Sequence, residues 1–149
     1  MTENTQVDRA LARIASCTDP DQLRQMLLNA HRQGQEDVRR AAQLRLYEVM
    51  PAAKPGTLEH DVWQSIYALE DQLKEERGKT VLLSRTRQKI SRDGEAQTVA
   101  DLVLGKQSEG FRMLVERDMT DLTFEAVALR HPNRFDENVR DAATKRLQR

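Results

Sequence analysis

The fold of this chain is decided by residues 57–92, which read TLEHDVWQSIYALEDQLKEERGKTVLLSRTRQKISR. Thr57 is a favoured residue type for a helix N-cap. Large apolar side chains follow it in a 4-3 rhythm, which is typical of a helix that packs along one face. This core stripe consists of Leu58, Val62, Ile66, Leu69 and Leu73.

The rhythm continues beyond Gly78 through Leu83 and Ile90. A glycine inside a helix costs only about 1 kcal/mol, so the sequence predicts one long central helix over about residues 58–92, straight or slightly bent at Gly78. A break at Gly78 is the alternative. The Asp93-Gly94 pair that follows is a strong turn signal.

The segments on either side of this helix also have helical patterns. Before it, Asp19-Pro20 reads as an N-cap followed by proline at the first helical position, and Gly34 reads as a stop. After it, Gly105 and Pro132 separate shorter amphipathic segments. Helices are predicted at about residues 5–17, 20–33, 35–49, 95–104, 108–117, 122–130 and 136–149.

The predicted fold class is therefore all-α, a helical bundle in which a long central helix is flanked by N-terminal and C-terminal helical hairpins. A chain of 149 residues has the usual size of one compact domain, so we expect residues 1–149 to share one core. The domain is divided into an N-terminal helical unit (1–50), a linker (51–56), the central helix (57–92) and short helices (95–149).

The two hairpins resemble each other. Residues 23–46 align without gaps onto residues 124–147, with eight identical pairs. One interpretation is a duplicated helical hairpin, related to helical-repeat scaffolds. The other is that two amphipathic helices rich in Ala, Arg and Leu align through composition alone. The identical pairs include Val38 with Val139, Ala42 with Ala143, and Arg45 with Arg146.

Composition narrows the class of protein. Lys and Arg number 24, as do Asp and Glu, so the formal net charge is zero and the chain as a whole is not a polycation. The single cysteine, Cys17, excludes an internal disulfide. The N-terminal residues lack the order of a signal peptide, and no apolar run is long enough to span a bilayer. We therefore expect a cytoplasmic protein that does not bind membranes.

Residue types with catalytic or ligand chemistry do not form recognisable motifs. His31, His60 and His131 stand apart and lack the paired spacing of a zinc site. Gly78-Lys79-Thr80 matches the end of a phosphate-binding loop, but the upstream glycine and the preceding strand are missing. We expect no enzyme activity, no metal and no cofactor.

The feature that most suggests a function is the basic stretch, residues 77–92. It contains no Asp or Glu, and the first acid after it is Asp93. Basic side chains one or two turns apart on a helix can follow a row of phosphates. On a helical wheel Arg85, Lys89 and Arg92 face outward, and Arg87 lies near the packing boundary. We expect a non-enzymatic accessory or regulatory protein that binds nucleic acid, DNA in preference to RNA. The predicted contact residues are Arg77, Lys79, Arg85, Arg87, Lys89 and Arg92.

The residues just before the basic stretch carry the opposite charge, with six acids and one lysine in residues 57–76. The alternative function is therefore a protein–protein interaction module, or an antiparallel homodimer in which the basic stretch pairs with an acidic helix. Trp63 and Tyr67 are four residues apart on a face turned away from the core stripe. We expect them to form a second core contact, with an exposed stacking patch as the alternative.

Overall fold

A computed structural model of the chain describes residues 2–148, with side chains from residue 5 onward. Within this range every regular element is helical, nine α-helices and two short 3-10 helices, so the all-α prediction is confirmed. None of these helices combines the length and apolarity that a membrane span requires. The chain divides into two compact units, Met1–Ala52 and Ala53–Arg149, and the boundary falls inside the segment predicted as a linker.

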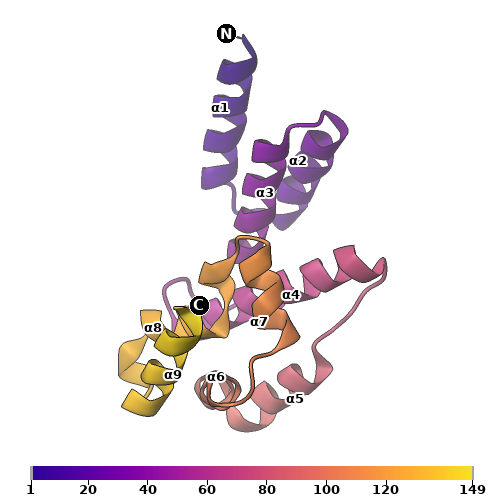
Figure 1. Cartoon of the computed structure of the whole chain (residues 1–149). Helices are drawn as coiled ribbons and strands as arrows, with labels where there is room; N and C mark the ends of the chain where they lie inside the picture. Colours follow the sequence, from indigo (N-terminus) through magenta and orange to yellow (C-terminus); the bar gives the residue numbers. More distant parts are fainter. Residues whose placement is uncertain (1, 149) are drawn as a thin grey trace. The chain divides into compact units, whose positions relative to one another are not determined.

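Each unit has its own hydrophobic cluster, where the sequence predicts one shared core. In the first unit, α2 and α3 form a hairpin and α1 packs against α3. Asp19 caps α2 by accepting a hydrogen bond from the Asp21 N–H (2.9 Å). Gly34 turns the chain with a φ of +69°. The three helices, at the indigo end of the colours in Figure 1, are α1 (Thr2–Ser16), α2 (Pro20–Arg32) and α3 (Glu36–Val49).

The second unit is built around α4, which contacts α6, α7 and α8. All five residues of the predicted core stripe are buried, so that prediction is confirmed. Thr57, Ser108, Thr123 and Asp136 cap α4, α7, α8 and α9, each accepting a hydrogen bond from the backbone N–H three residues later. The elements are α4 (Leu58–Arg77), α5 (Ser84–Asp93), α6 (Glu95–Leu104), α7 (Glu109–Glu116), η1 (Thr120–Leu122), α8 (Phe124–Arg130), η2 (Pro132–Arg134) and α9 (Glu137–Leu147).

The prediction of one continuous helix over residues 58–92 is wrong. α4 ends at Arg77, and residues 78–83 leave the helical path before α5 begins; Figure 1 shows the chain turning away from the axis of α4. Gly78 adopts the left-handed conformation (φ +71°) and donates its N–H to the Lys74 carbonyl (2.8 Å), as in a helix C-cap. The Glu70 carboxylate then accepts the Leu83 N–H (2.9 Å), which draws the returning chain back toward α4.

The two segments of the internal repeat both fold as helical hairpins, α2 with α3 and α8 with α9. The second helices begin at aligned positions, Glu36 and Glu137. The first helices differ, because α2 has 13 residues whereas α8 has 7 and is followed by η2. The hairpins are therefore confirmed, and duplication stays a prediction. The aligned pairs Val38 with Val139 and Ala42 with Ala143 are buried in both hairpins.

Candidate interaction surface

Arg87, one of the six predicted contact residues, is held within the second unit by Glu70. Its Nε donates to Oε2 of Glu70 (2.7 Å) and its Nη2 to Oε1 (2.6 Å), which is a bidentate pair. These hydrogen bonds outweigh the opposing effect of burial and raise the pKa of Arg87. Glu70 itself is buried. Arg87 thus links α5 to α4 through an ion pair, and its charge is already compensated within the chain.

Trp63 and Tyr67 lie beneath the same guanidinium. The Arg87 Cζ atom is 5.3 Å from the centroid of the Trp63 ring and 5.9 Å from that of Tyr67, within cation–π range. Both side chains are half-buried. Trp63 packs against the core cluster and donates its indole N–H to Glu95 (3.1 Å). The expected second core contact is confirmed for Trp63, with Arg87 as the covering residue.

Lys89 and Arg92 also have acidic neighbours. The Lys89 Nζ lies 2.6 Å from Oδ2 of Asp101 and 3.0 Å from Oδ2 of Asp93, and hydrogen bonds to these two carboxylates raise the pKa of Lys89. The Arg92 Nε lies 3.2 Å from Oδ1 of Asp93, yet 69% of the Arg92 side chain stays exposed. The positive charge of Lys89 is therefore compensated by two carboxylates of the same chain, whereas the Arg92 side chain is mostly exposed to solvent.

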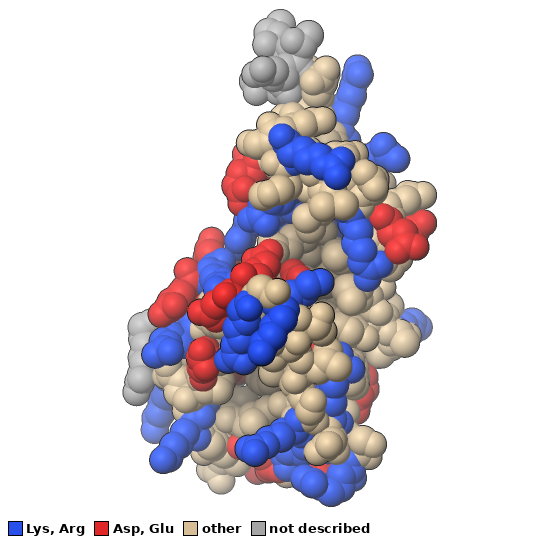
Figure 2. All heavy atoms as spheres, turned by 90° about the vertical axis from the view of Figure 1, so that its right-hand side faces the viewer, with Lys and Arg blue, Asp and Glu red and all other residues tan. Residues whose placement is uncertain are grey.

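The remaining three predicted residues, Arg77, Lys79 and Arg85, are exposed. Their side chains make no hydrogen bond or ion pair within the part of the chain that the structure describes. They follow one another from the end of α4, along the connection, to the first turn of α5. Figure 2 shows both basic and acidic side chains on the face that it draws. Since the second unit contains as many acidic as basic residues, these three cations are not part of a basic excess over the whole unit.

Arg77 lines a cavity of about 330 Å³, which we call the α4–α6 cavity. Its lining is mainly apolar, and the residues come from α4, α5, the connection between them, α6, the connection from α6 to α7, the start of α7, and α8. Gly110 of α7 is one of them, and a Cβ at this position would stand 3.0 Å from the Leu69 Cδ2 atom. The apolar side chains of the lining are Leu69, Leu73, Val81, Leu83, Leu102 and Phe124.

Four charged side chains also line the α4–α6 cavity. Glu125 is buried and paired with Arg146 (2.7 Å), so its charge is compensated. Arg77, Lys106 and Glu109 are exposed, and neither cation has an ion-pair partner among residues 5–148. The accessible charge around the cavity is therefore two cations and one carboxylate.

One exposed leucine lies next to the cavity. Leu82 is 55% exposed, and both of its chain neighbours line the cavity. Leu104, at the end of α6, is also exposed, but it lines a different pocket, between α6 and the start of α9. Leu82 thus extends the apolar surface of the cavity outward, where another molecule can reach it. The sequence pattern does not indicate that Lys106 and residues of α6 and α8 line this cavity. Only a prediction of the contacts between helices would have brought them together with α4.

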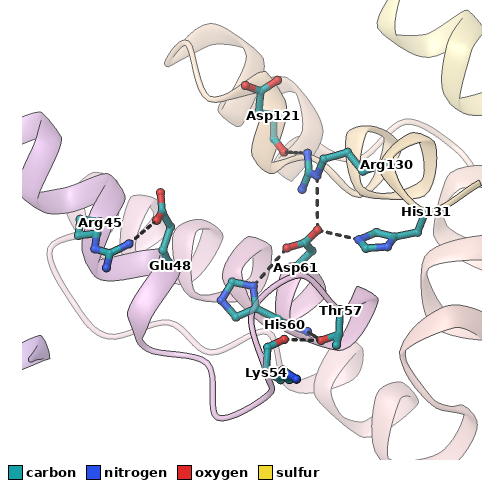
Figure 3. Close-up of polar contacts among 9 residues, drawn as sticks. All are labelled: Arg45, Glu48, Lys54, Thr57, His60, Asp61, Asp121, Arg130 and His131. Carbon is teal, nitrogen blue, oxygen red and sulfur yellow. Dashed lines mark hydrogen bonds and ion pairs between the residues drawn. The ribbon is translucent and has the colours of Figure 1, made fainter. Parts of the chain in front are cut away.

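A second polar cluster joins α4 to the segment around η2 (Figure 3). Asp61 accepts a hydrogen bond from His131 Nε2 (2.7 Å) and one from His60 Nδ1 (3.2 Å), and Arg130 Nε approaches it at 3.4 Å. Burial raises the pKa of Asp61, but the hydrogen bonds from His131 and His60 and the charge of Arg130 lower it by more, so the net shift is downward. Within residues 2–148 no cluster of His, Cys, Asp and Glu is suited to hold a metal. We interpret this cluster as a structural tie.

Comparisons with family models, curated proteins and solved structures find no match to this chain. Its function is therefore inferred from the chemistry of its own side chains.

Proposed function

We propose that this chain is a non-enzymatic interaction module that binds an acidic segment of a partner protein through the second unit. The observation that carries this proposal is an unpaired cation, Arg77, in the lining of the α4–α6 cavity, with the exposed Leu82 next to that lining. The unpaired Lys79 and Arg85 lie within three residues of Leu82 in the chain. Interfaces combine an apolar centre with a polar rim. Cations beside apolar surface match a protein segment that carries both carboxylates and apolar side chains.

Nucleic-acid binding by the same cations is the second proposal. It is supported by the exposure of Arg77, Lys79 and Arg85 and by the solvent-facing guanidinium of Arg92. For two reasons we rank nucleic-acid binding below binding of an acidic protein segment. Arg87 and Lys89 are already bound to carboxylates of the same chain, and the second unit contains as many acidic as basic residues. Affinity for a polyanion depends mainly on uncompensated charge.

A homodimer is the special case in which the acidic segment belongs to a second copy of the chain. The charge pairing that the sequence suggests between two copies is partly made within one copy, because Glu70 binds Arg87. Asp61 is likewise occupied by His131 and Arg130. A second copy would therefore have to use other carboxylates.

Photo-crosslinking tests which class of partner the surface meets. Leu82 is replaced by a benzophenone amino acid, the cells are irradiated, and the adducts are treated with protease or with nuclease. We expect adducts that protease removes and nuclease does not, and we expect them to disappear when Arg77, Lys79 and Arg85 are all changed to Glu. The same photoreactive group at the exposed Thr144 on α9 is the control for random collisions.

The other outcomes are equally specific. Nuclease-sensitive adducts would establish nucleic-acid binding, and titration of labelled single-stranded and duplex DNA and RNA would then show a slope of log K against log salt of about −3 for three released counterions on duplex DNA. Adducts with twice the mass of the chain would indicate a homodimer, to be checked by sedimentation. Adducts that survive the triple substitution would overturn the proposed surface.

A further inference from the structure

We propose that the α4–α6 cavity is an anchor pocket for one large apolar side chain, leucine or phenylalanine, of an acidic protein segment whose flanking carboxylates pair with Arg77 and Lys106. This inference rests on the proposed function and names the chemistry of the partner.

The size of the cavity fits one side chain. Sites for small molecules usually occupy about 300–1,000 Å³, and the α4–α6 cavity, at about 330 Å³, lies at the lower limit of that range. Protein interfaces commonly place one or two large side chains of the partner in a pocket of this kind, and these anchors account for most of the binding energy. The cavity thus has room for one anchor side chain and is at the small end for a whole cofactor.

The lining determines which side chain enters. Leu69 and Leu73 contribute from α4, Leu102 from α6 and Phe124 from α8, so a bound group meets aliphatic and aromatic carbon on several sides. A leucine or phenylalanine transferred from water into these surroundings gains the free energy of apolar burial. A charged or strongly polar side chain would lose its hydration without recovering it.

Two polar side chains of the lining, Ser108 and Glu125, are already engaged within the chain, which leaves fewer groups to recognise a nucleobase. The Ser108 hydroxyl oxygen accepts the Phe111 N–H (3.0 Å) to cap α7, and Glu125 is paired with Arg146 (2.7 Å). These groups are therefore committed within the chain, whereas recognition of a base depends on hydrogen bonds to its edge and on aromatic stacking. Phe124 is the one aromatic side chain of the lining.

The charged side chains that line the cavity determine which partner residues can lie next to the anchor side chain. Arg77 comes from the end of α4 and Lys106 from the connection between α6 and α7. Carboxylates on both sides of the anchor would pair with these cations, since arginine binds carboxylates through its planar fork. Glu109, also in the lining, would repel a carboxylate placed over the start of α7. The partner segment is therefore acidic beside Arg77 and Lys106 only.

A random-peptide library displayed on phage and panned against the full chain tests this inference. We expect enriched peptides to share a leucine or phenylalanine with Asp or Glu close to it on either side. Val81→Glu, which places a carboxylate in the cavity lining, is expected to weaken the best peptide at least about tenfold, the change that separates a central contact from a neutral one. The double substitution of Arg77 and Lys106 to Glu is expected to do the same.

Matched controls distinguish the effect of a charge placed in the cavity lining from the effect of the same charge placed nearby. Thr80→Glu makes the same charge change one residue away, at an exposed position outside the lining, and Lys74→Glu reverses a charge one turn earlier on α4. Both are expected to keep binding within about twofold. Circular dichroism establishes that every variant is folded. Thr86→Trp fills the cavity without adding charge, so it tests independently whether the peptide's anchor side chain occupies the cavity.

Three results would overturn the anchor pocket. They are the absence of any enriched sequence, enrichment of sequences without acidic or large apolar residues, and equal binding to the Val81→Glu and Thr80→Glu variants. Protease-sensitive crosslinks from position 82 combined with one of these results would leave the proposed function standing and remove the pocket alone. Nuclease-sensitive crosslinks would remove the proposed function itself.

Discussion

Glu70 is the residue on which the α4–α5 connection depends most. Its buried carboxylate accepts hydrogen bonds from the Leu83 backbone and twice from the Arg87 guanidinium. A buried carboxylate is tolerated only when its charge and its oxygen atoms are satisfied. One acid on α4 therefore both redirects the backbone after Gly78 and removes a cation from the outer surface.

Changing Glu70 to Ala is expected to lower the free energy of unfolding by about 2 kcal/mol. Loss of one partner of a fully buried ion pair costs about 3–5 kcal/mol, and the effect is smaller here because 32% of the Arg87 side chain is exposed. Urea denaturation measures the change. The control is Arg85→Ala, where an exposed cation is lost and stability should stay within about 0.5 kcal/mol. Equal effects of both changes would contradict a structural role for the pair.

Asp61 makes a specific contribution to stability in acid. The pKa of Asp61 is lower in the folded state than its ordinary value of 3.8, so its contribution is fully present above that pH and is lost as the pH falls through the folded-state pKa. Denaturant titrations from neutral pH down to about pH 2 should therefore show a smaller acid-induced loss for Asp61→Asn than for the natural chain. Parallel curves for the two proteins would mean that His131, His60 and Arg130 do not hold this carboxylate in its charged form.

At the scale of helices, local sequence predicts beginnings and buried faces better than it predicts ends. The cap at Thr57 and the apolar stripe from Leu58 to Leu73 follow from spacing and residue type, and the structure contains both. Gly78 carries an ambiguous signal, because a glycine is tolerated inside a helix at about 1 kcal/mol and is also the favoured residue of a C-cap. The choice between the two depends on Glu70 and Arg87, which are 17 residues apart in sequence.

The same limit applies to the candidate surface. The helical wheel correctly places Arg87 near the packing boundary, yet Lys89 binds Asp101 of α6, and nothing in the spacing of the basic stretch indicates that partner. The α4–α6 cavity likewise requires α6, α7 and α8 to converge on α4. Periodicity within single segments contains no information on that convergence.

Replacing Gly78 tests the end of α4. Alanine at a φ of +71° is strained, whereas asparagine tolerates the left-handed region. A Cβ added at this position would meet no other atom within 4 Å, so the effect is conformational only. We expect Gly78→Ala to lower the unfolding free energy by about 1 kcal/mol and Gly78→Asn to lower it by less. A rise in helix content by far-UV circular dichroism in the alanine variant would show instead that α4 can extend through residues 79–83.

At the scale of the whole molecule, the chain consists of two units with separate apolar clusters. The core of the first unit contains Ile14, Leu23 and Val38, among others, and that of the second contains Val62, Ile66 and Val99. Each unit carries as many basic as acidic residues. The segregation of charge that the sequence shows is therefore a local property of α4 and α5, which suits a limited contact with a partner better than attachment to a long polyanion.

Expressing residues 53–149 alone tests whether the second unit contains the whole interaction surface. Its cluster draws on α4, α5, α6, α8 and α9, so we expect a cooperative thermal transition and dispersed NMR amide signals. Residues 1–52 alone should be less stable, because units of that size bury only about 60% of the surface exposed by the unfolded chain. If the surface belongs to the second unit, the fragment 53–149 should bind the selected peptides within about twofold of the full chain. A folded fragment that binds them much more weakly would require the first unit to contribute contacts of its own, and substitutions of exposed residues on α2, beginning with Leu28, would then locate them.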